Sequence, residues 1–253
     1  MCATCGCDAE GQVTFHEPGH QHEPHEDHHS HQHKKIVDVE KNVLHENDLL
    51  AERNRGYFDA KNILALNLVS SPGSGKTSLL ERTLTDLKGE LDFCVIEGDQ
   101  QTTNDADRIH ATGTKVTQIN TGKGCHLDAH MVLHALQGMK PKENSVLFIE
   151  NVGNLVCPAM FDLGEKERVV IISVTEGDDK PLKYPDMFYS STLCIINKTD
   201  LLPYVPFDIE KVKANAKKVN HKLEILELSC TSGEGLNAWY SWLKSKVPAP
   251  ETA

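Results

Sequence analysis

The amino terminus is rich in side chains that bind transition metals. Cys2, Cys5 and Cys7 stand so close together that one ion could contact all three. Thiolates and imidazoles are the ligands that soft and borderline metals prefer. A dense run of histidines follows, at His16, His20, His22, His25, His28, His29, His31 and His33. This bias toward one kind of ligand predicts a protein that handles a metal.

The two parts of this segment predict different sites. Three thiolates, with the terminal amine if Met1 is removed, offer the sulfur and nitrogen donors that suit square-planar Ni(II). An unstructured stretch with oxidisable thiols is the alternative. The histidine run is interleaved with Glu, Asp and Pro, unlike a purification tag, and we interpret it as a low-affinity nickel buffer.

Composition sets the domain organisation and excludes several classes of function. Residues 1–35 have almost no apolar side chains, which predicts a disordered metal-binding tail. Residues 36–250 are enough for one domain. A net charge of −11 argues against a nucleic-acid partner. No apolar run is long enough for a bilayer or a signal core, so we expect no membrane, a cytoplasmic protein and reduced thiols.

Short apolar runs alternate with helical stretches beyond the tail. The segment 37–55 shows the apolar spacing of an amphipathic helix, with an apolar face at Val39, Val43, Leu44, Leu49 and Leu50. Strand-like runs then occupy 63–69, 93–96, 115–120, 146–149, 169–174, 193–196 and 224–228. Several are apolar throughout, as in strands covered on both faces. The alternation predicts an α/β fold of the P-loop NTPase type, with a mostly parallel, doubly wound sheet and helices on both faces.

A glycine-rich turn follows the first strand, in the sequence SSPGSGKTSLL at 70–80. Strand, glycine-rich turn and helix form the context of a phosphate-binding loop. Ser70 replaces the first glycine of the usual pattern, and a simple connecting turn is the alternative. We expect Lys76 to reach the β- and γ-phosphates and Thr77 to bind Mg²⁺. The residues assigned to the nucleotide here are Gly73, Ser74, Gly75, Lys76, Thr77 and Ser78.

The NKTD sequence after the sixth strand predicts the base that is bound. A carboxylate at Asp200 can accept from N1–H and the exocyclic amine of guanine, whereas adenine offers no such donor pair. Asp200 would therefore select GTP over ATP, with Asn197 holding the loop or the base edge and Lys198 covering the ring. Ser229, at the end of the last strand, could complete the base pocket.

Two strands deliver carboxylates at the edge of the sheet where ligands bind. Asp99 is the candidate for Mg²⁺ or its water shell, and Glu150 for positioning water or sensing the γ-phosphate. Either could instead cap the following turn. With Lys76 they form the catalytic set of a GTPase that converts GTP to GDP and phosphate. No arginine finger is evident, so we expect slow intrinsic hydrolysis.

A second candidate metal site lies in the same domain. Cys125 and His126 are adjacent, and Cys157 follows the segment that holds Glu150. Two neighbouring ligands cannot fill a tetrahedral site, so Cys157 or a second subunit would be needed. A structural Cys–His pair is equally compatible with these residues. Cys94, Cys194 and Cys230 lie in or beside strands and are predicted core residues.

The motifs together resemble those of the HypB/UreG family of SIMIBI-class GTPases. They are MCATCGC, VSSPGSGKTSLLE, VIEGDQQT, GKGCHLDA, ENVGNLVCPA, VTEGDDKPLKYP and NKTDLLP. The resemblance implies a GTP-dependent homodimer that delivers nickel to the large subunit of [NiFe]-hydrogenase, with a HypA-like nickel-binding partner. It also implies a tight nickel site at Cys2, Cys5 and Cys7, and a nickel or zinc site at Cys125, His126 and Cys157.

Two other functions fit parts of this pattern. A urease-accessory GTPase shares the fold and the NKxD motif but does not explain the thiol cluster. A metal store would use the GTPase domain only as a scaffold. The proximity of Cys157 to Glu150 favours a switch in which the γ-phosphate and Mg²⁺ change the metal-ligand geometry.

Overall fold

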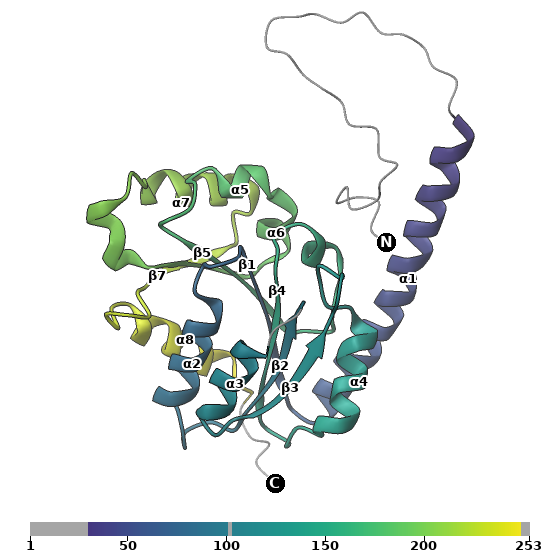
Figure 1. Ribbon diagram of the computed structural model, residues 1–253, viewed down its shortest axis with the longest axis horizontal. Coiled ribbons are helices and arrows are strands. Elements are labelled where there is room, and N and C mark those ends of the chain that lie inside the picture. The colour runs from purple at the N-terminus through teal and green to yellow at the C-terminus, as the bar shows by residue number, and fades with distance from the viewer. Residues whose placement is uncertain (1–29, 101–102, 249–253) are drawn as a thin grey trace, which may run out of the picture. The chain divides into compact units, whose positions relative to one another are not determined.

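Seven parallel strands form one sheet in the order β3-β2-β4-β1-β5-β6-β7 (Figure 1). The computed structural model describes residues 30–100 and 103–248, with side chains from residue 42 onward. The strands are β1 Leu64–Ser70, β2 Phe93–Asp99, β3 Lys115–Asn120, β4 Val146–Gly153, β5 Glu167–Ser173, β6 Leu193–Asn197 and β7 Glu224–Glu227. All seven predicted strands are confirmed. The parallel α/β sheet of the predicted fold class is confirmed with them.

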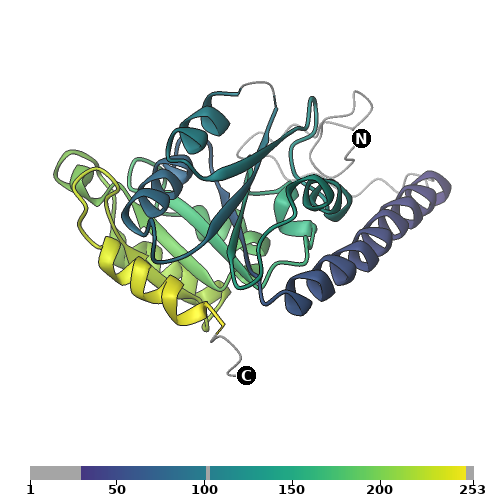
Figure 2. The same ribbon diagram turned by 90° about the horizontal axis from the view of Figure 1, so that it is seen from below.

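The helices cover both faces of the sheet (Figures 1 and 2). Successive side chains of β1 point to opposite faces of the sheet. On one face Leu64, Leu66 and Leu68 pack in a core with α2, α3 and α8. On the other face Ala65 packs with α4. A third core lies between the sheet, α6 and α7. The helices are α2 Lys76–Asp86, α3 Asn104–Ala111, α4 Ala129–Met139, α5 Lys180–Lys183, α6 Pro185–Ser190, α7 Ile209–Val219 and α8 Leu236–Lys246, with 3₁₀ turns η2 Cys157–Met160 and η3 Thr199–Tyr204.

A β-bulge interrupts β4 immediately after Glu150. Leu68 of β1 pairs with Glu150, but Ser70, two residues later, pairs with Gly153, so β4 contains one extra residue. Up to Glu150 the strand is held on both sides, by β1 and by β2. Bulges of this kind re-aim a strand and are frequent beside functional sites. Here the bulge redirects the chain from the interior of the sheet toward η2.

The first helix, α1, is longer than the sequence pattern predicts. It spans Ser30–Ala60, so its first residues belong to the segment that we assigned to the tail. The chain divides into units 1–46 and 47–253, and the domain boundary after residue 35 stays a prediction. In the second unit Leu49, predicted for the apolar face, is exposed, while Ala51 and Phe58 are buried.

Two buried amides attach the second half of α1 to the domain. Asn47 Oδ1 accepts from the backbone amide of Ala129 at 2.9 Å. Asn54 Nδ2 donates to the carbonyls of Ala129 and Leu163 at 2.9 and 3.1 Å. The apolar pattern misses this contact because amide side chains make it. Within the described ranges no helix combines the length and the apolar character needed to cross a bilayer.

Candidate nucleotide and metal sites

The phosphate-binding loop joins β1 to α2 and requires glycine at position 75. Gly75 has φ +92°, and a Cβ at this position would lie 2.4 Å from Nδ2 of Asn197. A side chain is therefore excluded both by backbone conformation and by space. Gly75 directly precedes Lys76, the first residue of α2. The positive end of the α2 dipole thus faces the loop, as anion binding requires.

Glu150 occupies the centre of this site. Its Oε1 accepts from Nζ of Lys76 at 2.9 Å and from Oγ1 of Thr77 at 2.6 Å. Lys76 and Thr77 are the two residues that the sequence assigns to the phosphates and to Mg²⁺. The Glu150 side chain is fully buried, and its Oε2 has no hydrogen-bond partner among the described residues. An oxygen buried in this way fits a site that receives a cation or a donor from a ligand.

A second buried carboxylate, Glu97, lies beside Glu150, and sequence reasoning missed it. The two residues are directly paired across β2 and β4. Glu97 is 2% exposed, and its Oε2 has no partner within the described part of the chain. Burial, followed by the nearby Glu150 charge, raises the pKa of Glu97 to about 8. The sequence did contain a feature that could have identified Glu97: it lies two residues before Asp99 and therefore on the same face of the strand.

Lys76, Thr77 and Glu97 line a pocket of about 520 Å³ at the carboxyl edge of the sheet, while Glu150 is buried behind Lys76 and Thr77 and is not part of its wall. Of the predicted nucleotide residues, the loop 73–78 and Lys198 lie on its wall, together with Asp99. Arg108 of α3 also lines it, where the sequence showed no arginine near the phosphates. Arg108 is held by Glu81 at 2.6 Å and Asp105 at 3.3 Å, and donates to Ser78 Oγ at 3.3 Å.

The NKTD loop is attached directly to the phosphate-binding loop. Asn197 Nδ2 donates to the carbonyl of Ser74 at 2.9 Å, and Lys198 Nζ to that of Gly73 at 2.6 Å. Asn197 therefore lies where it holds the loop, one of the two alternatives that the sequence left open. Ser229 Oγ donates to Asp200 Oδ1 at 2.5 Å. This contact joins the two residues assigned to the base, outside the wall of the phosphate pocket.

Cys125, His126 and Cys157 come together, although Cys157 is far from the others in sequence. Their ligand atoms all lie within 4.8 Å of one another. The Cys125 and Cys157 sulfurs are 2.8 Å apart, and Cys125 Sγ is 3.7 Å from His126 Nδ1. This arrangement supplies three donors of the types that bind Zn²⁺ or Ni²⁺. It is the one group of three such residues found among the described residues, and its metal role stays a prediction.

The surroundings of this cluster keep the imidazole neutral. His126 stacks on Phe161 with ring centroids 3.9 Å apart. Burial lowers the pKa of His126, so its nitrogen lone pair is available at neutral pH. Cys157 is fully buried at the start of η2. Asn154 Nδ2 donates to the carbonyl of Cys125 at 3.4 Å and ties the two segments together.

The other cysteines and histidines named in the sequence analysis fall into two groups. Cys94 and Cys194 are buried in the sheet as predicted, while Cys230 is only half-buried at the edge of a core. The predicted tail ligands lie outside the residues whose side chains the structure describes: Cys2, Cys5, Cys7, His16, His20, His22, His25, His28, His29, His31 and His33.

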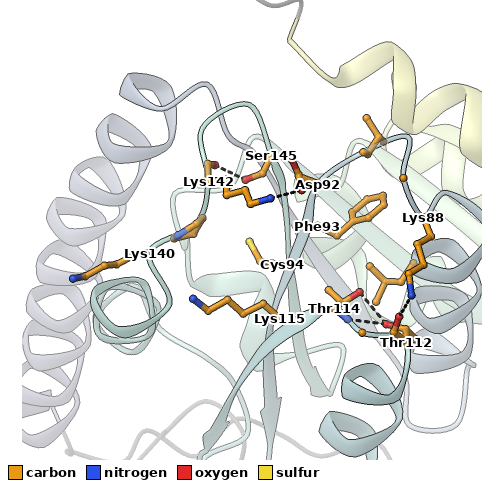
Figure 3. Close-up of a pocket in the computed structure, with 15 residues that line it drawn as sticks. Lys88, Asp92, Phe93, Cys94, Thr112, Thr114, Lys115, Lys140, Lys142 and Ser145 are labelled. Atoms are coloured by element: carbon orange, nitrogen blue, oxygen red, sulfur yellow. Dashed lines mark hydrogen bonds and ion pairs between the residues drawn. The ribbon is translucent and has the colours of Figure 1, made fainter.

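A second pocket, of about 380 Å³, lies at the opposite edge of the sheet, where β2, β3 and β4 begin (Figure 3). Lysines surround it, but three of them bind oxygens of this chain. Lys88 donates to Thr112 O at 2.9 Å and Lys115 to Met139 O at 2.6 Å. Lys142 pairs with an exposed aspartate of the rim. No predicted nucleotide or metal residue reaches this pocket, so it is not the candidate site.

Comparison with known proteins agrees with this arrangement. Residues 64–227 match the nucleotide-binding domain described as CobW/HypB/UreG. The chain is 55% identical to the hydrogenase maturation factor HypB of Rhizobium leguminosarum bv. viciae over 236 residues, covering 93% of this chain and 75% of the relative. HypB of Escherichia coli strain K12 is 54% identical, with coverages of 93% and 78%.

Two crystal structures of HypB have the same fold. HypB from Archaeoglobus fulgidus superposes with a TM-score of 0.75 at 42% identity, covering 80% of this chain and 99% of that one. HypB from Helicobacter pylori, in complex with nickel, gives 0.74 at 37% identity, with coverages of 82% and 100%. The phosphate-binding loop, the linked NKTD loop and these relatives lead to one conclusion. The chain belongs to the CobW/HypB/UreG family of nucleotide-binding proteins, within its HypB group.

Proposed function

We propose that this protein is a slow GTPase and nickel metallochaperone that assists insertion of Ni(II) into the large subunit of [NiFe]-hydrogenase. The observation that carries the proposal is the single segment 150–157. It begins at Glu150, which binds both Lys76 and Thr77, and ends at Cys157, which lies against Cys125. The nucleotide site and the thiolate cluster are thus joined by a short stretch of chain.

The segment also touches the phosphate-binding loop at Gly153. Gly153 pairs with Ser70, and a Cβ at Gly153 would lie 3.2 Å from Cα of Pro72. Asn154 then contacts the carbonyl of Cys125. Phosphates that engage Lys76 would compete with Glu150 for the same ammonium group. Release of Glu150 would loosen the segment, and with it the position of Cys157, so nucleotide state and metal affinity would be coupled.

Each part of the site has a distinct chemical task. Lys76 and the amides that begin α2 would bind the β- and γ-phosphates, and Asp200 would accept from guanine. Thr77 and Asp99 would hold Mg²⁺, which would neutralise phosphate charge. Glu150 would accept a proton from, or orient, the attacking water. Arg108 is engaged with two carboxylates, which agrees with a low intrinsic rate.

The nickel cargo would bind at two kinds of place in this chain. Cys125, His126 and Cys157 offer three donors, and a second subunit of a GTP-dependent homodimer could add the fourth. The site would accept Zn²⁺ as well as Ni²⁺, because both bind imidazole and thiolate. The tail thiolates and histidines would add a tight site and a low-affinity buffer. These thiols need a reducing compartment, so we propose that the protein is cytoplasmic. We further propose a HypA-like nickel-binding protein as its partner.

One titration tests the coupling. Ni²⁺ is added to the full chain, carrying Cys2→Ser, Cys5→Ser and Cys7→Ser, with GDP or with a non-hydrolysable GTP analogue. Thiolate-to-nickel absorbance then reports on the cluster of Cys125 and Cys157. We expect affinities that differ at least several-fold between the two nucleotides. Equal affinities would refute the coupling, and absence of the band in both states would refute the metal site.

A cellular assay separates a GTP-driven chaperone from a metal store. Lys76→Ala removes the phosphate ligand, and the thiols of the cluster are unchanged. Hydrogenase activity of a deletion strain should not be restored by this variant if GTP drives delivery. Lys88→Ala, on the opposite edge of the sheet, is the matched control and should restore activity. Restoration by Lys76→Ala would support storage instead.

A further inference from the structure

Glu97 is a buried carboxylate to which the proposed function gives no task. It is 2% exposed, it lines the phosphate pocket, and its Oε2 has no hydrogen-bond partner among the described residues. Buried polar atoms without a partner are rare in folded proteins, and each one points to an ion, a water or a ligand. The cost is greatest for a carboxylate, because the ionised group carries a full charge.

The charges around Glu97 leave this end of the sheet negative. Glu97 is paired with Glu150 across β2 and β4, so two carboxylates lie side by side on one face of the sheet. Asp99 and Asp105 add further negative charge, whereas Lys76, which attracts Glu97, is already bound to Glu150 at 2.9 Å. One ammonium group cannot balance two buried carboxylates. Phosphates that engage Lys76 would draw even this cation away from them.

The end of β2 directs Glu97 and Asp99 toward the same pocket. Side chains two residues apart in a strand lie on one face, and both of these residues line the pocket wall. Gly98, between them, faces the other side, where a Cβ would lie 2.8 Å from the side chain of Leu127. The carbonyl of Asp99 accepts from the backbone amide of Thr121 at 2.9 Å. The two carboxylates are therefore presented from a fixed backbone.

We propose that Glu97 and Asp99 form a site for a hard divalent cation, Mg²⁺ in the cell, and that this site takes up its cation before the nucleotide binds. Carboxylate oxygens are the ligands that Mg²⁺ and Mn²⁺ prefer, and Mg²⁺ keeps several waters. A pocket of about 520 Å³ has room for these waters and, later, for phosphates. The site rests on the proposed function, in which Thr77 and Asp99 hold Mg²⁺, and adds Glu97 to it.

The types of donor keep this site distinct from the candidate nickel site. Oxygens of Glu97 and Asp99 suit Mg²⁺, whereas the sulfur and nitrogen atoms of Cys125, His126 and Cys157 suit Ni²⁺ or Zn²⁺. A cation bound at Glu97 would neutralise carboxylates that otherwise repel the phosphates. The pocket would thus be prepared for an anionic ligand by one metal, while the neighbouring cluster is left to another.

Mn²⁺, a paramagnetic substitute for Mg²⁺, tests the site in the full chain without nucleotide. Electron paramagnetic resonance measures the free ion, so a titration gives the number of bound ions and their affinity. Glu97→Gln is nearly isosteric and removes the charge. We expect it to bind one Mn²⁺ fewer than wild type, or to bind that ion at least about tenfold more weakly. The tail is the same in both proteins, so its ligands cancel in the difference.

Glu167→Gln is the matched control. Glu167, at the start of β5, is also buried with an Oε2 that has no hydrogen-bond partner in the described part of the chain, but it does not line the pocket. Its variant should bind Mn²⁺ as wild type does. An equal loss in both variants would reflect net charge alone and would overturn the proposal. If Glu97 instead keeps a proton and needs no ion, Glu97→Gln and wild type bind Mn²⁺ equally, which also overturns it.

Iron-directed cleavage locates the ion in the wild-type chain and needs no variant. Fe²⁺ takes the place of Mg²⁺ at carboxylate sites, and with ascorbate and oxygen it produces hydroxyl radicals that cut the nearby backbone. We expect cuts close to Glu97 that excess Mg²⁺ suppresses. Cuts beside Cys125 should persist, because Mg²⁺ does not displace an ion bound to thiolate. Absence of cuts near Glu97 would overturn the proposal.

Neither measurement uses nucleotide, so the site and the proposed function can fail separately. Loss of the proposed function would show as a wild-type chain that hydrolyses no GTP but still binds Mn²⁺ through Glu97. Loss of the site would show as Mn²⁺ binding that Glu97→Gln leaves unchanged, in a chain that still hydrolyses GTP.

Discussion

Asn197 at the end of β6 donates through Nδ2 to the carbonyl oxygen of Ser74, 2.9 Å away. Its Oδ1 accepts from the backbone amide of Cys230 at 3.3 Å and from the backbone amide of Lys198. One buried side chain thus connects the phosphate-binding loop, the NKTD loop and the loop after β7. The NKTD loop and the phosphate-binding loop are thus joined in one hydrogen-bonded unit.

Gly75→Ala should weaken nucleotide binding without unfolding the domain. The new Cβ would meet Asn197 Nδ2 at 2.4 Å, and φ +92° adds about 1–2 kcal/mol of strain. We expect GTP affinity to fall at least about tenfold, measured by calorimetry. Gly89→Ala is the matched control: its φ is +86°, but no atom lies within 4 Å of the Cβ. Equal affinities in the two variants would contradict the role of the contact.

Glu150→Gln should change stability and ligand binding in opposite directions. Lys76 loses its buried ionic partner, which costs on the order of 2–3 kcal/mol without nucleotide. Nucleotide binding should tighten, because a negative charge is removed beside the phosphates and Lys76 is released. GTP turnover should fall. Urea unfolding, calorimetry and phosphate release measure the three effects, and unchanged binding would show that Glu150 does not compete with the phosphates.

Thr83→Val should destabilise the domain through a buried tryptophan. Trp239 Nε1 donates to Thr83 Oγ1 at 2.9 Å inside the core. Valine keeps the shape but leaves the indole N–H without an acceptor, at a cost of about 1–3 kcal/mol. Thr85→Val removes a similar hydroxyl on the exposed face of the same helix, so it should cost much less. Denaturant unfolding followed by tryptophan fluorescence compares the two.

Asp86→Asn tests a pH-dependent contribution. The hydrogen bond from Arg82, and then that from Tyr240, lower the pKa of Asp86 from 3.8 despite some burial. A lowered folded-state pKa stabilises the protein above the unfolded value, and this stabilisation is lost as the pH falls through the folded value. The difference in unfolding free energy between wild type and Asp86→Asn should therefore be constant near pH 6. It should shrink toward zero as the pH falls below 3.8.

Tyr240→Phe provides the graded control for this experiment. It removes only the tyrosine hydrogen bond to Asp86, which is 2.8 Å long, and leaves the Arg82 contact in place. The same pH dependence should appear with a smaller amplitude. A difference between wild type and Asp86→Asn that stays independent of pH well below 3.8 would show that the carboxylate contributes only by packing.

Local patterns predicted the parts of the fold that local chemistry determines. The apolar runs gave all seven strands, and the GSGKT and NKTD sequences gave the two nucleotide loops. Contacts between distant residues were not accessible in this way. Arg108 lines the phosphate pocket only because α3 packs beside α2. Glu97 becomes a candidate site residue only because the sheet pairs it with Glu150. The face of α1 was misjudged at Leu49 because the buried contacts of the helix come from Asn47 and Asn54 together with Ala51 and Phe58.

The extra residue in β4 determines where this molecule can move. Before the bulge β4 is paired with β1 on one side and β2 on the other. The backbone at Glu150 therefore cannot move without breaking hydrogen bonds of the sheet. Beyond the bulge a single pairing with β1 remains, between Gly153 and Ser70, and β4 ends at Gly153. We therefore expect any response to GTP to displace the chain after Gly153, which carries the thiol of Cys157, rather than the backbone at Glu150.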